Sequence, residues 1–237
     1  MAPKNTSQFD AGQPETDTSA DVPRIVRGEN RLPVIVTILV ALGLPFLLPE
    51  RLGLGPRWLM PVLVGALLAA TIVIEPGLIT RRSAVLRLMA IGIVVIFVLE
   101  ASWSTAHLLI ELIDGGPETN NPGLLLATGA LVWTANNIVF ALLYWELDSG
   151  GPTGRAHHTA RYPDFAFPGH LNPELVPPDW QPVFVDYLYL GFTNSLAFSP
   201  TDVMPLTHWP KLMMALQSII SVAILSLVIA RAVNILT

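Results

Sequence analysis

The chain contains no cysteine and few charged residues. Asp, Glu, Lys and Arg make up 13% of its 237 residues, whereas about a quarter is usual in soluble domains. The absence of cysteine excludes disulfides, thiolate metal sites and cysteine nucleophiles, and it leaves the redox compartment open. The chain also lacks a glycine-rich phosphate loop, a nucleophile elbow and a carboxylate pair at catalytic spacing. We therefore expect neither enzyme activity nor a cofactor.

Hydrophobic residues are correspondingly abundant. They make up 52% of the chain, and the mean hydropathy is +0.55. This composition predicts an all-α integral membrane protein whose main partner is the lipid bilayer. The net charge of -5 is small, and the acidic residues lie mostly in the tail and the loops. A nucleic-acid partner is therefore not expected.

Residues 1–30 differ in composition from the rest of the chain. They are polar, rich in Thr, Asp, Pro and Ser, and without helical periodicity, which predicts a disordered tail. The first apolar run begins only near Leu32, and no small-residue cleavage site follows it, so a signal peptide is not expected. An inert tail is favoured over a regulatory one.

Five apolar segments approach the length of a membrane span, for which about 20 residues are needed. The third is too long for one upright span, so it either tilts or ends in an interfacial turn after Trp103. The first four make a helical region over residues 31–147. The five predicted spans run from Leu32 to Leu48, Trp58 to Ile74, Ala84 to Ile113, Gly123 to Leu147 and Trp209 to Leu236.

A long polar segment separates the fourth span from the fifth. Residues 148–182 contain seven prolines, which break helices and bias the preceding residue toward extended conformations. This predicts an extended, solvent-facing loop. Residues 183–237 then form a separate unit, in which a short helix precedes the last span.

Basic residues predict the orientation of the spans, because they are more frequent in cytoplasmic loops. They flank the start of span one and follow span two, whereas the turn between spans three and four has Asp114 and Glu118 and no Lys or Arg. This places the N-terminus and residues 148–182 in the cytoplasm and the acidic turn outside. The basic residues concerned are Arg24, Arg27, Arg31, Arg81, Arg82 and Arg87.

Span three carries a polar stripe. Glu100, Ser104, His107 and Glu111 are spaced by four, three and four residues, which places them on one face of a helix. One interpretation is an ion or proton path in which Glu100 and His107 exchange protons. The favoured interpretation is that only Glu100 lies deep and bonds to a neighbouring helix, because the acidic turn begins just after Glu111.

Spans four and five carry amides and small polar residues. Asn136 and Asn137 lie near the middle of span four, where amides hydrogen-bond across helices, so helix contacts are favoured over substrate contacts. Gln217, Ser218 and Ser221 form a polar face on span five, which indicates either close packing or the lining of a pore.

The proline-rich segment contains residues of the types that zinc accepts. They are His157, His158, Asp164 and His170, but their spacing does not match a compact metal site. Solvated side chains are favoured over ligands, so no metal site is expected.

A short apolar and aromatic segment precedes the last span. Residues 184–197 are mostly apolar and aromatic, with Thr193, Asn194 and Ser195 toward their end. This pattern suits a short helix dipping into the membrane. A polar turn and Pro205 then lead into the last helix. This order of a short helix, a polar turn and a span is typical of a re-entrant pore loop.

The segment resembles the pore module of two-transmembrane potassium channels. The resemblance covers residues 186–233, with span four as the outer helix, and rests on the Tyr-Leu-Tyr run, Asp202 and Pro205. It implies a re-entrant pore helix, a homo-oligomer and a pathway for monovalent cations. The residues that align with the filter of that family are Ala197, Phe198, Ser199, Pro200, Thr201 and Asp202.

The aligned filter residues differ from those of potassium channels. Ser199 and Thr201 replace glycines that permit the unusual filter dihedrals, and Pro200 fixes φ and removes an N–H. Potassium selectivity by a ring of carbonyls is therefore not expected. Side-chain oxygens of Ser199, Thr201 and Asp202 remain as ligands of a hydrated cation, and the alternative is a plug.

The whole chain is also similar to bacterial multi-pass membrane proteins grouped as a domain of unknown function. This closer resemblance rests on the Tyr-Leu-Tyr and Phe-Ser-x-x-Asp runs, and it implies a bacterial inner-membrane protein without supplying an activity. Potassium channels carry the pore loop outside, whereas the basic residues here predict it inside, so the side of the loop stays open.

Three functions are compatible with these patterns. The first is a weakly selective cation pathway through the pore-like unit of a homo-oligomer. The second is a proton-coupled or small-solute transporter that uses Glu100 and His107. The third is a non-conducting membrane scaffold.

Overall fold

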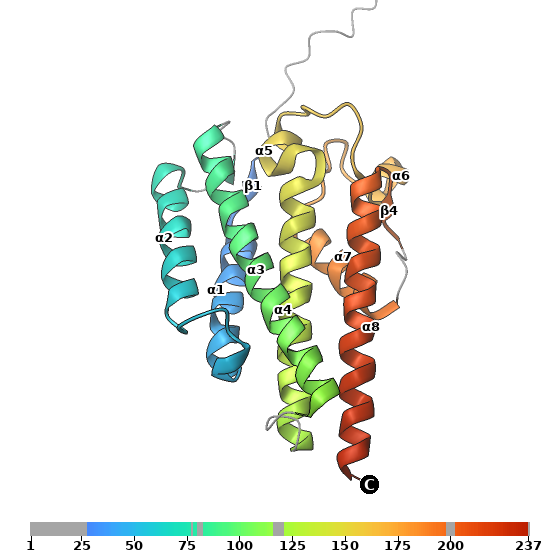
Figure 1. Ribbon diagram of the computed structural model, residues 1–237. Coiled ribbons are helices and arrows are strands. Elements are labelled where there is room, and N and C mark those ends of the chain that lie inside the picture. Colours follow the sequence, from blue (N-terminus) through green and yellow to red (C-terminus); the bar gives the residue numbers. More distant parts are fainter. Residues whose placement is uncertain (1–27, 77, 80–82, 116–120, 198–201, 237) are drawn as a thin grey trace, which may run out of the picture.

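The computed structural model describes residues 28–76, 78–79, 83–115, 121–197 and 202–236. These residues form a helical bundle in which the longest helices run roughly along one common direction (Figure 1). Its main helices are α1 (Leu32–Leu47), α2 (Leu59–Ile74), α3 (Ala84–Asp114), α4 (Pro122–Leu147), α7 (Phe184–Ala197) and α8 (His208–Leu236).

Three of these helices, α3, α4 and α8, are long and apolar enough to cross a membrane. The prediction of a mainly helical chain is therefore confirmed, with helices long and apolar enough to cross a membrane. Helices α1 and α2 have 16 residues each, which corresponds to about 24 Å of helix at 1.5 Å per residue. Of the five predicted spans, these two are the short ones.

Helix α3 is continuous through Trp103 to Asp114, so the alternative of an interfacial turn after Trp103 is wrong. Its first turn is capped by Ser83, whose side chain accepts from the N–H of Leu86. Gly115 ends it with a φ of 83°, a conformation that favours glycine. The helix crosses the bundle obliquely (Figure 1), as a tilted span does.

Helix α4 is the central element of the bundle. Its N-cap Asn121 accepts hydrogen bonds from Gly123 N and Leu124 N at 2.9 and 3.1 Å, and Pro122 occupies the first turn, where its missing N–H costs nothing. The helix packs against α1, α3, α7 and α8. A methyl group on Gly129 would lie 2.7 Å from Cγ2 of Val228, so α4 and α8 approach each other too closely for a larger residue.

Two short antiparallel ladders lie at the end of the bundle where α4 finishes, drawn at the top of Figure 1 and here called the upper end. Strand β1 (Glu29–Asn30) pairs with β2 (Leu78–Ile79) and joins the start of α1 to the turn between α2 and α3. Strand β3 (Phe165–Ala166) pairs with β4 (Met204–Pro205). The second ladder fixes the proline-rich segment to the residues that precede α8.

The proline-rich segment is folded. The expectation of an extended, solvent-facing loop is wrong, because Asp148, Arg155, Phe165 and Phe167 are buried. Prolines stand in the first two positions of its short helices, where they fit. These elements are the 3-10 turn Asp148–Gly150, α5 (Gly151–Ala156), α6 (Pro168–Leu171) and the 3-10 turn Pro173–Leu175.

Phe165 is the centre of an aromatic cluster under this segment. Its ring lies 5.4 Å from that of Tyr144, 5.6 Å from Trp209 and 6.4 Å from Tyr187, measured between centroids. The three partners belong to α4, α8 and α7, respectively. Edge-to-face aromatic pairs of this kind add stability beyond their buried area, so the cluster holds three helices together at the upper end.

Helix α7 has the bounds that the sequence predicted, 184–197. It starts at the upper end, where the ring of Phe184 packs edge-on against Trp145, and runs down to the level of Gln217 on α8. Residues 198–201 lie outside the described part of the chain. Val203 is again buried, and β4 lies beside β3 at the upper end (Figure 1).

Candidate functional site

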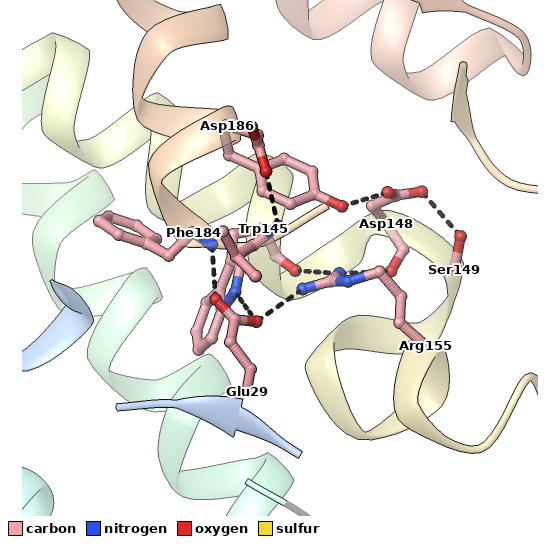
Figure 2. A network of polar contacts seen from close by, with 9 residues as sticks. Glu29, Trp145, Asp148, Ser149, Arg155, Phe184 and Asp186 are labelled. Atoms are coloured by element: carbon pink, nitrogen blue, oxygen red, sulfur yellow. Dashed lines mark hydrogen bonds and ion pairs between the residues drawn. The ribbon is translucent and has the colours of Figure 1, made fainter. Parts of the chain in front are cut away.

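Arg155 is the centre of a buried polar network at the upper end (Figure 2). Its Nη1 donates to the carbonyl oxygens of Trp145 and Asp148 at 2.7 and 3.0 Å. Its Nη2 lies 3.6 Å from Oε2 of Glu29, and the guanidinium stands 4.9 Å from the ring centroid of Tyr187. One cation therefore joins β1, the end of α4 and α7.

A sharp turn brings Arg155 back over the end of α4. Ser149, Gly150 and Gly151 all have positive φ, at 56°, 81° and 81°. A methyl group on Gly151 would lie 2.8 Å from the carbonyl oxygen of Glu146, so glycine is required there. The guanidinium thus reaches carbonyls at the C-terminus of α4, where the helix dipole favours a cation.

Asp148 is fully buried and fully bonded. Its Oδ1 accepts from Oγ of Ser149 at 2.9 Å and from the N–H of Asp164 at 3.0 Å, and its Oδ2 accepts from the hydroxyl of Tyr187. The carboxylate oxygens of Asp164 in turn accept from Ser149 N and from Thr207 Oγ1. Because buried carboxylates are tolerated when their oxygens are hydrogen-bonded, this part of the network has a structural role.

Glu29 closes the network from the N-terminal side. Its carboxylate accepts from Nε1 of Trp145 at 2.8 Å and from the backbone N–H of Phe184 (Figure 2). The second bond satisfies an N–H in the first turn of α7. Burial raises the pKa of the Glu29 carboxyl above its ordinary value, and the charge of Arg155 and the two hydrogen bonds oppose this increase.

A cavity of about 100 Å³ lies beside this network, between α1, α2, α3 and α4. Helix α1 packs on α4 and α2 more closely than on α3. The cavity lies in the gap between α1 and α3. Apolar side chains form most of the wall, among them Ile38, Leu68, Ile93 and Leu142. The charged residues that line it are Arg31, Glu75, Arg87 and Glu146.

Arg31 and Glu75 form a buried ion pair at the cavity wall. Nη2 of Arg31 bonds to Oε2 of Glu75, and Nη1 donates to the carbonyl oxygen of Thr71 at 3.3 Å. Nε of Arg31 is buried and has no hydrogen-bond partner among the described residues. A buried donor without a partner is costly, so the Arg31 side chain is held here at the expense of one hydrogen bond.

Glu146 is the second polar group of the cavity that lacks a hydrogen-bonding partner. It lies in the last turn of α4 and is 4% exposed. In the described part of the chain its carboxylate accepts no hydrogen bond, and its charged neighbours are Arg155 and Arg87. A buried carboxylate with charge neighbours and no hydrogen bond is unusual in a purely structural role.

Two smaller cavities lie farther along α1, toward the end of the bundle opposite the upper end, here called the lower end. Their volumes are about 30 and about 10 Å³. Glu100 lines both of them, together with Pro45, Leu48 and Met60. The three cavities therefore follow one another along α1, with the carboxylate of Glu146 beside the first and that of Glu100 beside the last.

A thin apolar layer separates the large cavity from the smaller ones. It spans about one helical turn, 5.4 Å along each helix. Six buried side chains form this layer, two from each of α1, α3 and α4. The residues that face the large cavity are Ile38, Val94 and Leu142. Those that face the nearer small cavity are Ala41, Phe97 and Val139.

The polar stripe of α3 faces the turn between α1 and α2. Glu100 Oε2 accepts from Leu54 N at 3.2 Å, and Ser104 donates to the carbonyl oxygen of Leu52 at 2.8 Å. Glu100 thus bonds to a turn, whereas the sequence predicted a neighbouring helix. His107 packs on Trp103 with ring centroids 4.4 Å apart, so the described contacts do not bring Glu100 and His107 together.

The amide pair on α4 bridges helices. Asn136 Nδ2 donates to Thr105 Oγ1 of α3 at 2.7 Å, and Asn137 Oδ1 is 3.4 Å from Nε2 of Gln217 on α8. These are the helix contacts that buried amides make within membranes.

Gln217 is buried between α4, α7 and α8. Its Oε1 accepts from Tyr144 Oη and from Asn194 Nδ2, both at 2.8 Å, and its Nε2 donates to the carbonyl oxygen of Gly191 at 2.9 Å. Ser218 donates to the carbonyl oxygen of Asn194. Gln217 and Ser221 are each 1% exposed, so neither has a free surface with which to line a pore between copies.

Most of the filter-like residues lie outside the described residues. Ala197 is the last residue of α7, Phe198, Ser199, Pro200 and Thr201 follow in the part that is not described, and Asp202 is exposed.

The histidines of the proline-rich segment have separate partners. His157 Nδ1 lies 2.9 Å from the carbonyl oxygen of Thr153, and His170 Nδ1 accepts from Phe167 N at 3.2 Å. Burial lowers the pKa of His170. Within the described ranges, no group of three or more potential metal ligands occurs.

Several residues of the network and the cavity were not predicted from the sequence. Glu29, Glu146, Asp148 and Arg155 each belong to a segment read as a tail, a span end or a loop. A signal was present, because two acids stand two residues apart at the end of span four and an arginine follows a glycine-rich turn. Ionisable residues at such a span end are candidates for function.

Comparison with known proteins gave no match: no family model fits the chain, and no curated protein and no solved structure is similar to it. The resemblance of residues 186–233 to a channel pore module therefore stays a prediction.

Proposed function

We propose that the protein is a multi-pass membrane transporter that moves a small solute, coupled to protons, along the space between α1, α2, α3 and α4. The supporting observation is the series of three cavities with Glu146 beside one end and Glu100 beside the other. Ionisable groups inside a membrane are costly and typically mark substrate paths or proton relays.

The proposed membrane position follows from the charged ends of the short helices. Glu50, Arg51 and Arg57 in the turn between α1 and α2 mark one membrane surface, and Arg31 and Glu75 mark the other. The length of α1, about 24 Å, together with this turn approaches the hydrocarbon thickness of about 30 Å. In this position all five long apolar segments cross the bilayer, and the cavities extend from one side to the other.

The proposed orientation places the upper end in the cytoplasm of a bacterial cell. Helices α1, α3 and α8 begin at that end and α5 lies there (Figure 1). These elements bring Arg31, Arg87, Lys211 and Arg155 to it, and basic residues concentrate on the cytoplasmic side of membrane proteins. The solute then meets Glu146 from the cytoplasm and Glu100 from the opposite side.

In the proposed mechanism the apolar layer around Phe97 closes the path. Because α2 packs closely on α3 whereas α1 packs only loosely on it, α1 is the element that moves against α3. On its own side of the layer, each carboxylate releases a proton when it binds the polar group of the solute. This arrangement replaces the predicted pair Glu100 and His107 with the pair Glu100 and Glu146.

The test is solute-driven proton movement in liposomes loaded with a pH-sensitive dye. Pools of amino acids, aliphatic amines and short carboxylates are added outside, one pool at a time. Wild-type protein is expected to change the internal pH with at least one pool, and Glu146→Gln and Glu100→Gln are each expected to reduce the rate at least tenfold. Glu174→Gln, which alters an exposed acid outside the three cavities, is the matched control and keeps the wild-type rate.

Two results would contradict the proposal. One is the absence of proton movement with every pool, from protein shown to be folded and inserted in both orientations. The other is a wild-type rate in both the Glu146→Gln and Glu100→Gln variants.

A second function is favoured by α7 and β4. Helix α7 begins beside Trp145 and extends to Gln217, and β4 pairs with β3 at the upper end, as expected for the two sides of a re-entrant segment. The outer face of α7 is apolar and exposed, with Val185, Tyr189, Phe192 and Leu196. We propose that this face meets other copies in a homo-oligomer that passes monovalent cations.

This second proposal predicts a tetramer in detergent and a salt flux from liposomes that Asp202→Asn lowers. A monomer without flux would contradict it and leave the cavity path unaffected, because that path is contained in one chain.

A further inference from the structure

We infer that the cavity beside Glu146 binds a small zwitterion with a branched aliphatic side chain, that is, a molecule of the chemical class of leucine. The inference rests on the proposed function in that this cavity is the cytoplasmic end of the proposed path. It names the chemical class of solute for which the cavity is suited.

The charges that line the cavity are balanced. Arg31 and Arg87 supply two positive charges, and Glu75 and Glu146 supply two negative ones. A ligand with a single charge would meet one attractive and one repulsive set of groups. A zwitterion places a charge of the correct sign toward each.

The polar groups of the lining specify the ligand more closely. The carboxylate of Glu146 accepts no hydrogen bond from a described residue and is a partner for an ammonium group. The guanidinium groups of Arg31 and Arg87 line the same cavity and are partners for a carboxylate. Charge-assisted hydrogen bonds of this type are roughly twice as strong as neutral ones, and the ligand would supply both.

The remaining wall is apolar. Ile38, Ile93 and Leu142 are buried or largely buried branched side chains of the lining, and they offer no hydrogen-bonding group to a third polar substituent. The volume of about 100 Å³ admits only a small molecule. Small-molecule sites usually combine such apolar walls with a few convergent polar groups.

The test is calorimetric titration of the purified protein in detergent with three compounds that share a 3-methylbutyl group. Leucine carries both charges, 3-methylbutylamine carries only the ammonium group, and 4-methylpentanoate carries only the carboxylate. Leucine is expected to bind at least tenfold tighter than either of the others. Glu146→Gln is expected to weaken leucine binding at least tenfold and to strengthen the binding of 4-methylpentanoate, because a negative charge that repels its carboxylate is removed.

A second pair of variants tests the position of the site without altering a charge. Ala90 lines the cavity, so Ala90→Leu is expected to fill it and to abolish leucine binding. Ala69 on α2 is exposed, and Ala69→Leu is the matched control with wild-type affinity. Wild-type affinity in Ala90→Leu would exclude this cavity as the site.

The possible results separate this inference from the proposed transport. Equal affinities for leucine and 3-methylbutylamine, or no binding of leucine, overturn the zwitterion even where Glu146-dependent proton movement occurs with another pool. Glu146-dependent binding of leucine without any proton movement supports the site and overturns the transport.

Discussion

The two sides of α4 differ in whether their buried polar groups are hydrogen-bonded. On the side of α7 and α8, the buried amides of Asn194 and Gln217 bond to each other, to Tyr144 and to backbone carbonyls. On the side of α1, α2 and α3, the carboxylate of Glu146 lines a cavity and has no hydrogen-bond partner among the described residues, and Nε of Arg31 is buried without one.

The packing differs in the same direction. Where α4 meets α8, there is no room for a methyl group on Gly129. Where α4 faces α1 and α3, about 100 Å³ is left open. Protein interiors normally fill such space. Close packing and satisfied polar groups indicate that the half formed by α4, α7 and α8 is structural. The cavity and its unsatisfied polar groups indicate that the half formed by α1, α2, α3 and α4 binds a ligand.

The largest expected effect comes from removing the cation that joins the two halves. Arg155→Met leaves Glu29 without its buried counter-ion and frees two carbonyls of α4. Breaking a buried ion pair typically costs about 3–5 kcal/mol, so the free energy of unfolding in mixed detergent micelles should fall by that amount. Arg161→Met, whose partner Tyr162 is exposed, is the control, and equal losses in both variants would refute the role of Arg155.

Adding one methyl group to the tightly packed half should destabilise the fold. Gly129→Ala forces α4 and α8 apart, and overpacking typically costs about 1–3 kcal/mol. Gly65→Ala on α2, where nothing lies within 4 Å of the added atom, should be neutral or slightly stabilising in the same unfolding assay. An unchanged midpoint for Gly129→Ala would mean that the two halves do not differ in packing.

A smaller loss is expected from the polar network of α7 and α8. Gln217→Leu leaves the hydroxyl of Tyr144 without a partner and removes the bonds to Asn194 and to the carbonyl of Gly191, at a cost of about 1–2 kcal/mol. Ser218→Ala, which removes one long hydrogen bond of 3.3 Å, should cost less. A Gln217 that lined a pore would instead leave stability unchanged and alter ion flux.

The smallest effect is a pH dependence that originates at the boundary of the two halves. The pKa of Glu29 is raised above its ordinary value of 4.5, chiefly by burial, so the folded state retains a proton that the unfolded state has lost. Its contribution to stability is complete below pH 4.5 and is lost as the pH rises through the raised pKa.

The measurement for Glu29 is the unfolding midpoint over a pH series. Glu29→Gln should have a flatter profile than the wild type across that window. Glu174→Gln, which alters an exposed acid, should reproduce the wild-type slope, and an unchanged slope in Glu29→Gln would contradict the assignment.

The helix bounds were largely predictable because they depend on neighbours in the sequence. The predicted short helix 184–197 has both ends in place, and the predicted spans agree with α1, α2, α3, α4 and α8 to within one residue at each end. Apolar runs, prolines and capping residues act locally. The proline-rich segment was misjudged because proline in the first turn of a helix is compatible with that helix.

The sequence by itself determined a mainly helical chain with apolar helices able to span a membrane, and it marked Glu100 as an ionisable residue inside one of them. Only the tertiary structure decided that Gln217 is enclosed and that Glu146 faces a cavity with Arg31, a residue more than a hundred positions away. The reason is physical: helix formation depends on residues within a few positions, whereas burial, cavities and unpaired polar atoms depend on which helices pack together.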